Sequence, residues 1–180
     1  MRGVERAALV AWLGAKQIGA WVGPDVGGWT AFSDAATDGF DLAKACDTMI
    51  ALTADLGGAA IAAAVHNGDV LGILAVDRGR HVASYISYPG ILDEGPPAED
   101  RKPEISGAAG MLAALGSTRG EEELRHVLAV GTSEQFVYPL NLHAGFVRAF
   151  GLPEYSLSFG YAAAEAGTFP GDPAGFVRVG

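Results

Sequence analysis

The chain has 180 residues, of which 49% are hydrophobic, and its net charge at pH 7 is −9. This length fits one domain, and the hydrophobic content excludes disorder over most of the chain. The excess of acidic residues argues against nonspecific binding to nucleic acid or to an anionic membrane, because both attract basic surfaces.

The first predicted element is an amphipathic helix over residues 4–14, with Leu9, Trp12 and Leu13 on its apolar side. A signal peptide is the alternative, but Glu5 would stand in its charged region and no small-residue cleavage site follows. The most apolar run has about half of the roughly 20 residues that a membrane-spanning helix needs. We therefore expect a protein that does not enter the membrane.

Residues 17–22 and 28–33 are predicted to form a hairpin around the loop at 23–27, in which Pro24 and the flanking glycines favour a turn. A phosphate-binding loop is the alternative for this glycine-rich segment. It is disfavoured because the loop lacks a Gly-Lys-Ser or Gly-Lys-Thr ending and precedes a strand-like segment rather than a helix.

The clearest helix is predicted over residues 39–56, where apolar residues recur at helical spacing. Thr37, Asp38 or Asp41 can cap its start, and Gly57 and Gly58 can end it. Cys46 lies on the apolar side of this helix, where we expect a buried structural role rather than a nucleophilic one. Because it is the only cysteine, no internal disulfide can form, and we expect a cytoplasmic protein.

A β-meander is predicted next, with strands at residues 59–65, 70–76 and 82–88. Its turns are Asn67-Gly68 and Arg78-Gly79, and a type I′ turn needs a positive φ at both central residues. The first two strands are apolar throughout, which predicts that both are central in the sheet with covered faces. The third alternates, which predicts one partly wet face.

An exposed acidic, proline-rich loop is predicted at about residues 93–104. Helices are predicted at 105–116, 120–130 and 139–150, followed by a last strand at 155–162. The resulting fold class is α+β, with a mostly antiparallel sheet around the central meander and helices on at least one face. One globular domain is expected to span the whole chain.

The search for catalytic and metal-binding motifs finds little. No two of the four histidines have the spacing of metal ligands, so the sequence predicts no metal site and no cofactor. No serine-nucleophile motif is present, which leans against an enzyme, and the scattered basic residues predict no nucleic-acid binding. His66 and Asp69 flank the first meander turn, either as a polar pair at the sheet end or simply closing strand and turn.

The order of several short motifs resembles a group of single-domain bacterial proteins with no established activity. The motifs are GWTAFSD, a helix, VHNGDVLGILAVDRGRHVASYISYPGIL, then GLP and SFGYA, across residues 28–162. The turn His-Asn-Gly-Asp is less acidic than that group's pattern, whereas the Tyr-x-Ser-x-Pro-Gly segment is kept. The resemblance implies the fold and a bacterial origin, and it implies no particular function.

Two classes of function fit the sequence. The first is a non-catalytic acidic protein-binding module of immunity or inhibitor type, which would bind a basic protein partner. The second is an enzyme or a small-ligand-binding protein with a pocket at the end of the meander. The candidate binding residues are Asp93, Glu94, Glu99 and Asp100 in the acidic loop, and His66, Asp69, Tyr85, Ser87 and Tyr88 at the meander end.

Overall fold

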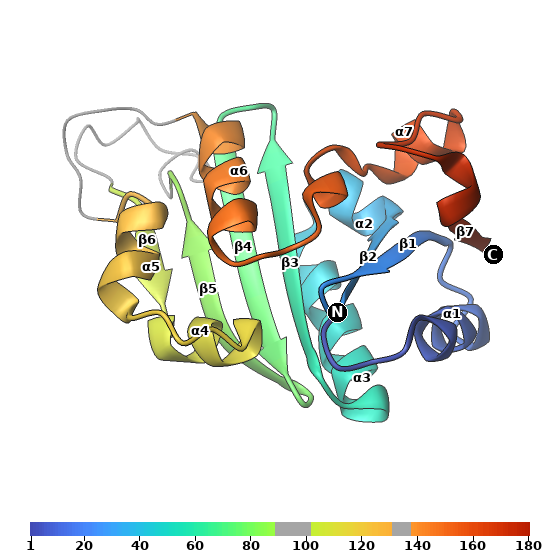
Figure 1. Ribbon diagram of the computed structural model, residues 1–180, viewed down its shortest axis with the longest axis horizontal. Coiled ribbons are helices and arrows are strands. Elements are labelled where there is room, and N and C mark those ends of the chain that lie inside the picture. The colour runs from blue at the N-terminus through green and yellow to red at the C-terminus, as the bar shows by residue number, and fades with distance from the viewer. Residues whose placement is uncertain (89–101, 131–137) are drawn as a thin grey trace.

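The computed structural model describes residues 1–88, 102–130 and 138–180. It shows an α+β fold with two antiparallel sheets, in the strand orders β2-β1-β7 and β3-β4-β5-β6 (Figure 1). The strands are β1 (Ala20–Val26), β2 (Trp29–Asp34), β3 (Ala59–His66), β4 (Val70–Asp77), β5 (Arg80–Ile86), β6 (Glu104–Ser106) and β7 (Val177–Val179). The helices are α1 (Arg6–Ala15), α2 (Ala35–Asp38), α3 (Leu42–Leu56), α4 (Ala108–Leu115), α5 (Glu121–Val127), α6 (Pro139–Ala149) and α7 (Tyr161–Glu165), with 3₁₀ helices η2 (Glu154–Ser158) and η3 (Pro173–Gly175). Within the described ranges, no helix has the length and apolar character needed to cross a membrane.

Helices cover both faces of the four-stranded sheet (Figure 1). Helices α4, α5 and α6 lie on one face, where Met111, Leu124 and Phe146 are fully buried against β4 and β5. Helix α3 covers the other face, and its Leu52 joins a second cluster that also includes Val22 of the three-stranded sheet. The two apolar clusters therefore sandwich the meander, and the second one also ties the two sheets together.

Arg2 bridges the edges of the two sheets. Its backbone pairs with Trp29 of β2 and with Ala59 of β3, and the Arg2 N–H donates to the Ala59 carbonyl at 2.8 Å. Among the described residues, no strand pairs with the edge of β3 beyond this bridge. Past Arg2, the two edges therefore run on without pairing to each other.

The predicted meander is confirmed, including both turns. Asn67 and Gly68 have φ of 48° and 81°, and Arg78 and Gly79 have φ of 45° and 76°. The third strand also alternates as predicted, with Tyr85 buried between half-buried neighbours. The predicted positions in the sheet are partly wrong, because β3 is an edge strand and β5 is central. A continuous apolar run indicates that both faces of a strand are covered. It does not indicate whether the strand has a neighbour on each side in the sheet.

The turn of the first hairpin lies at Gly27-Gly28 rather than at residues 23–27, so that Pro24 belongs to β1. A bulge between Val22 and Asp25 accommodates this proline, which cannot donate a ladder hydrogen bond. The glycine and proline at positions 23 and 24, which were predicted to form the turn, therefore mark a β-bulge instead.

Three other boundaries differ from the predictions. The helix predicted over 39–56 is preceded by α2 and begins only at Leu42, because Phe40 takes a positive φ of 57° between the two helices. The helix predicted over 105–116 begins after the short strand β6. The strand predicted at 155–162 is wrong, since this segment forms η2 and the start of α7, and the late strand is β7.

Candidate functional site

Two of the predicted meander-end residues are engaged in the core. Tyr85 is buried, its hydroxyl donates to the Leu128 carbonyl at 2.8 Å, and burial raises the pKa of that hydroxyl. Ser87 is also buried, and its Oγ accepts a hydrogen bond of 2.8 Å from the Leu71 N–H. Tyr85 therefore ties the end of α5 to the sheet, and Ser87 satisfies a backbone donor of β4.

The other predicted meander-end residues lie nearer the surface. The His66 ring packs on the Phe40 ring with centroids 5.0 Å apart, and its Nε2 lies 3.1 Å from the Asn67 side-chain nitrogen. The Asp69 N–H donates to the His66 carbonyl and closes the turn, while the Asp69 side chain is exposed. Tyr88 is half-buried just after β5. The predicted loop residues Asp93, Glu94, Glu99 and Asp100 lie outside the described residues.

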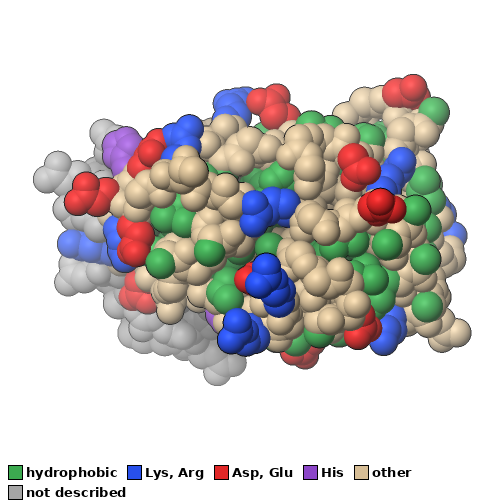
Figure 2. Space-filling model, turned by 60° about the horizontal axis from the view of Figure 1, so that its bottom comes forward, with side chains coloured by type: hydrophobic (Ala, Val, Ile, Leu, Met, Phe, Trp, Pro, Cys, Tyr) green, Lys and Arg blue, Asp and Glu red, His purple; other side chains and the backbone are tan. Residues whose placement is uncertain are grey.

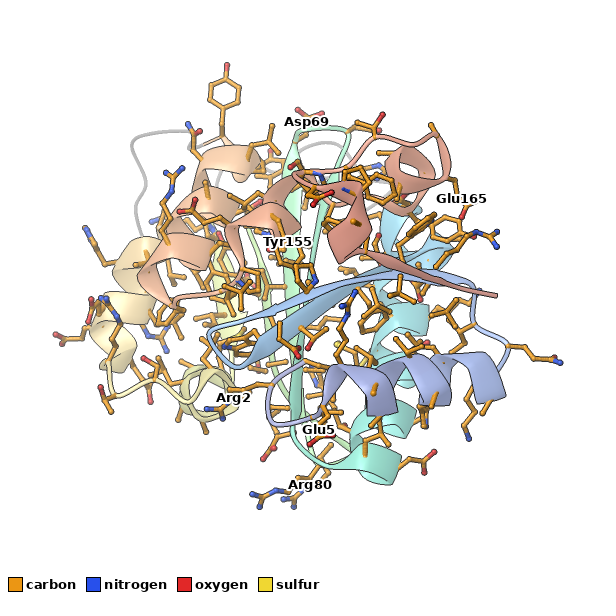
Figure 3. All side chains as sticks on the ribbon, turned by 45° about the vertical axis from the view of Figure 1, so that its right-hand side comes forward. Arg2, Glu5, Asp69, Arg80, Tyr155 and Glu165 are labelled. Carbon is orange, nitrogen blue, oxygen red and sulfur yellow. The ribbon has the colours of Figure 1, made fainter. Side chains whose placement is uncertain are left out.

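Exposed apolar side chains occur at this same end of the four-stranded sheet. The β3–β4 turn, the end of β5 and the start of α6 lie together at the top of Figure 1. At the start of α6, Tyr138 is 65% exposed and Leu140 is 58% exposed. Exposed acids accompany them, namely Asp69 in the turn and Glu104, which pairs with Ile86 at the end of β5 (Figure 3 shows Asp69). We call Asp69, Glu104, Tyr138 and Leu140 the sheet-end surface.

Leu140 was not among the sequence-predicted site residues. The apolar side of α6 is formed by Leu142, Phe146 and Val147, all of which are buried. Residue 140 is two positions before Leu142, which places it on the other side of a helix. A large apolar residue off the apolar side of an otherwise regular helix was thus a usable signal.

A cavity of about 120 Å³ opens between the two sheets. Its walls come from β2, β3, α3 and α6 and from the segment at residues 152–159. The walls are mostly apolar, and β3 lines the space with the small side chains Ala60, Ala62 and Ala63 beside Ile61. The cavity therefore occupies the region where the edges of β2 and β3 run on unpaired.

Among the residues that the structure describes, Asp34 is the only acidic side chain in the cavity wall, and it is 5% exposed. It ends β2 and caps α2, since its Oδ1 accepts from the Thr37 N–H at 2.9 Å and from the Thr37 hydroxyl at 2.6 Å. The other carboxylate oxygen takes no part in this cap. The sequence signal was an aspartate directly before a helical segment, which is typical of an N-cap.

His143 faces the cavity from α6 and is 8% exposed. It lies one turn before Val147, which lines the same cavity. Neither ring nitrogen makes a hydrogen bond with a described residue, and neither is fully enclosed. Burial lowers the pKa of His143 below its ordinary value of 6.5, so the ring is neutral at pH 7. A polar residue within the apolar side of a predicted helix was the signal for it.

Metal binding and thiol chemistry gain no support from the described residues. No group of three histidine, cysteine, aspartate or glutamate side chains gathers there in a way that could hold a metal ion. The Cys46 thiol is half-buried on α3, and burial, followed by the nearby Asp47 charge, raises its pKa. A raised pKa keeps the sulfur protonated and weakly nucleophilic.

The described residues thus offer two candidate binding sites, namely the sheet-end surface and the cavity between the sheets. The chain matches no protein-family model, no curated protein and no solved structure. The resemblance indicated by the order of short motifs therefore stays a prediction.

Proposed function

We propose that this protein is an acidic protein-binding module of immunity or inhibitor type, which holds a basic protein partner on its sheet-end surface. The observation that carries the proposal is the pair of large apolar side chains, Tyr138 and Leu140, that stand exposed at the start of α6. A few residues, tyrosine prominent among them, supply most of the affinity in protein interfaces, and a polar rim surrounds them.

Charge supports a basic partner. The chain carries a net charge of −9, and Asp69 and Glu104 are exposed on elements at the same end of the four-stranded sheet. Opposite charge speeds the encounter between proteins and selects among partners. By contrast, on the face that Figure 2 brings forward, acidic and basic side chains are interspersed and neither sign forms a continuous field.

The pocket at the meander end, the alternative predicted from the sequence, receives no comparable support. Tyr85 and Ser87 both spend their hydroxyl groups on backbone partners inside the core. A ligand there would have to be held by His66 and Tyr88 without them.

Site-specific crosslinking in the native cell tests the proposal. A photoreactive residue at position 140 is expected to capture one predominant protein of net positive charge. The same residue at position 26 is the control, because Val26 is 45% exposed in the other sheet. Equal capture at both positions, or capture of an acidic protein at position 140, would show the proposal to be wrong.

The captured partner, once purified, should bind the chain directly in a calorimetric titration. Leu140→Ala is expected to weaken binding about tenfold, whereas Val26→Ala is expected to leave it unchanged. Raising the salt concentration from about 0.05 M to about 0.3 M should weaken binding further, because salt screens the attraction between charged surfaces. Salt-independent binding would rule out the electrostatic part of the proposal.

A further inference from the structure

We propose that the cavity between the two sheets is a binding site for a small primary amine with a compact apolar body. This site is independent of the sheet-end surface, because α6 presents Leu140 outward and His143 into the cavity. The proposal rests on the size of the space, on its walls, and on two buried polar side chains that remain able to accept hydrogen bonds.

The size of the cavity sets the size of the ligand. The space is about 120 Å³, which is somewhat smaller than the ~150 Å³ apolar cavity known to hold benzene. A ring of about five carbon atoms with one polar group therefore fits. The apolar walls, which include Ile61, Met49 and Val147, would cover the body of such a ligand.

His143 is the first polar group aimed at the ligand. It is nine-tenths buried, yet its ring makes no hydrogen bond within the described residues. Its ring nitrogens are not among the fully enclosed atoms without a partner, so they remain accessible to a ligand. The neutral imidazole offers one nitrogen that accepts a hydrogen bond from a ligand.

Asp34 sets the charge of the ligand. Its Oδ1 is spent on capping α2, and its Oδ2 is left for the cavity. Among the described residues, no lysine or arginine side chain lines the cavity, and burial lowers the pKa of the Met1 amino group in its wall to about 5. An anionic ligand would therefore meet a carboxylate with no compensating positive charge at pH 7. An ammonium group would instead donate to the Asp34 carboxylate, which pairs a buried charge.

Three probes of equal size test the charge preference. Cyclopentylamine, cyclopentanol and cyclopentanecarboxylate share one ring and differ in the polar group. In thermal unfolding at pH 7.5, the amine should raise the midpoint most, the alcohol less, and the carboxylate not at all, because only ligands that bind the folded state stabilise it. Backbone amide shifts in an NMR titration should concentrate in β2, β3 and α6. Absence of a shift with the amine, or an equal shift with the carboxylate, would overturn the proposal.

Two pairs of matched variants locate the effect. Asp34→Asn keeps a capping oxygen for Thr37 but removes the charge, and it should weaken amine binding about tenfold while leaving alcohol binding unchanged. Its control is Asp41→Asn, which alters the exposed cap of α3 outside the cavity and should change neither. His143→Phe should weaken binding of both the amine and the alcohol, whereas the exposed His126 can be changed to Phe without effect.

The Asp34 pair keeps the proposal falsifiable if His143→Phe fails to fold. If Asp34→Asn binds the amine as tightly as the parent protein, the Asp34 carboxylate does not contribute to amine binding, which contradicts the proposal. A third variant, Ala63→Val, adds two methyl groups to the cavity wall, and it should weaken all binding by reducing the space.

Discussion

The hydroxyl of Tyr155 replaces a missing backbone hydrogen bond at the bulge of β1. It donates to the Pro24 carbonyl at 2.7 Å and accepts from the Ala31 N–H at 3.1 Å, so one side chain from η2 joins β1 to β2 (Figure 3). Gly23 makes the room, because a Cβ there would lie 2.6 Å from the Tyr155 ring. The proline, the glycine and the distant tyrosine act as one unit.

Removing this hydroxyl is expected to cost stability. Tyr155→Phe should lower the free energy of unfolding by about 1–2 kcal/mol, because two backbone groups lose their partner in a partly buried place. Urea unfolding measures the change. Tyr161→Phe is the control, since the Tyr161 hydroxyl makes no hydrogen bond within the described residues, and it should stay within about 0.5 kcal/mol of the parent. Equal effects of the two changes would contradict this role for Tyr155.

His143 should make the protein less stable in acid. Burial lowers its pKa in the folded state, so the unfolded chain binds more protons below about pH 6.5. The free energy of unfolding should therefore fall as the pH drops from 7.5 to 5. His143→Phe should remove part of that fall, and His126→Gln should not. Urea midpoints at the two pH values decide, and identical slopes in all three proteins would contradict the assignment.

Among single residues, the sequence predicted those whose role depends on chain neighbours. It missed those whose role depends on residues far away in the sequence. Asn67-Gly68 and the cap at Asp41 follow from backbone geometry within a few residues. Asp34 and His143 come from different halves of the chain, and only the tertiary fold brings them to one cavity. The spacing of Asp34 and His143 in the sequence therefore does not predict that both line one cavity.

At the scale of elements, α4 lies unusually close to β5. A Cβ on Gly110 would lie 2.5 Å from the Val82 carbonyl oxygen, and a Cβ on Gly107 would also clash with that carbonyl. Both glycines stand where the helix crosses the strand. The helix can therefore touch the sheet backbone only because these positions lack side chains.

Gly110→Ala should consequently destabilise the protein, although alanine favours an isolated helix by about 1 kcal/mol over glycine. The clash with backbone should outweigh that gain and lower the free energy of unfolding by about 1–3 kcal/mol. The matched change is Gly145→Ala in α6, where a new Cβ meets nothing within 4 Å, and it should stabilise by up to about 1 kcal/mol. Opposite signs for the two changes in chemical denaturation are the expected result.

Elements with a strong local pattern were predictable, and those defined by distant contacts were not. The meander strands and α6 follow from periodicity and turn chemistry. Residues 155–162 were predicted as a strand, but Tyr155 and Phe159 instead pack with Phe176, at ring distances of 5.6 and 4.8 Å. That aromatic cluster favours the 3₁₀ turn over a strand, and it involves residues that lie outside any local window.

At the scale of the whole molecule, the two sheets are joined by a common apolar cluster as well as by the bridge at Arg2. The apolar cluster beneath α3 combines Leu9 of α1, Val22 of β1 and Val76 of β4, so it spans both sheets. The bridge at Arg2 adds backbone hydrogen bonds between the same two sheets. The length predicted one domain and the order of the elements predicted the α+β class, but the division into two sheets was not visible in the sequence.

This shared cluster predicts that the two sheets unfold together. All three tryptophans lie within residues 12–29, so fluorescence reports on the three-stranded sheet and α1, whereas far-ultraviolet circular dichroism also reports on the helices over the other sheet. The two signals should give one urea midpoint, as expected for a cooperative unit. Leu52 is fully buried in the shared cluster, so Leu52→Ala should lower the free energy of unfolding by about 2–5 kcal/mol. The urea midpoints from fluorescence and from circular dichroism should fall by the same amount. A fluorescence transition that precedes the dichroism transition would instead show two separately folding parts, and it would contradict the prediction of one domain.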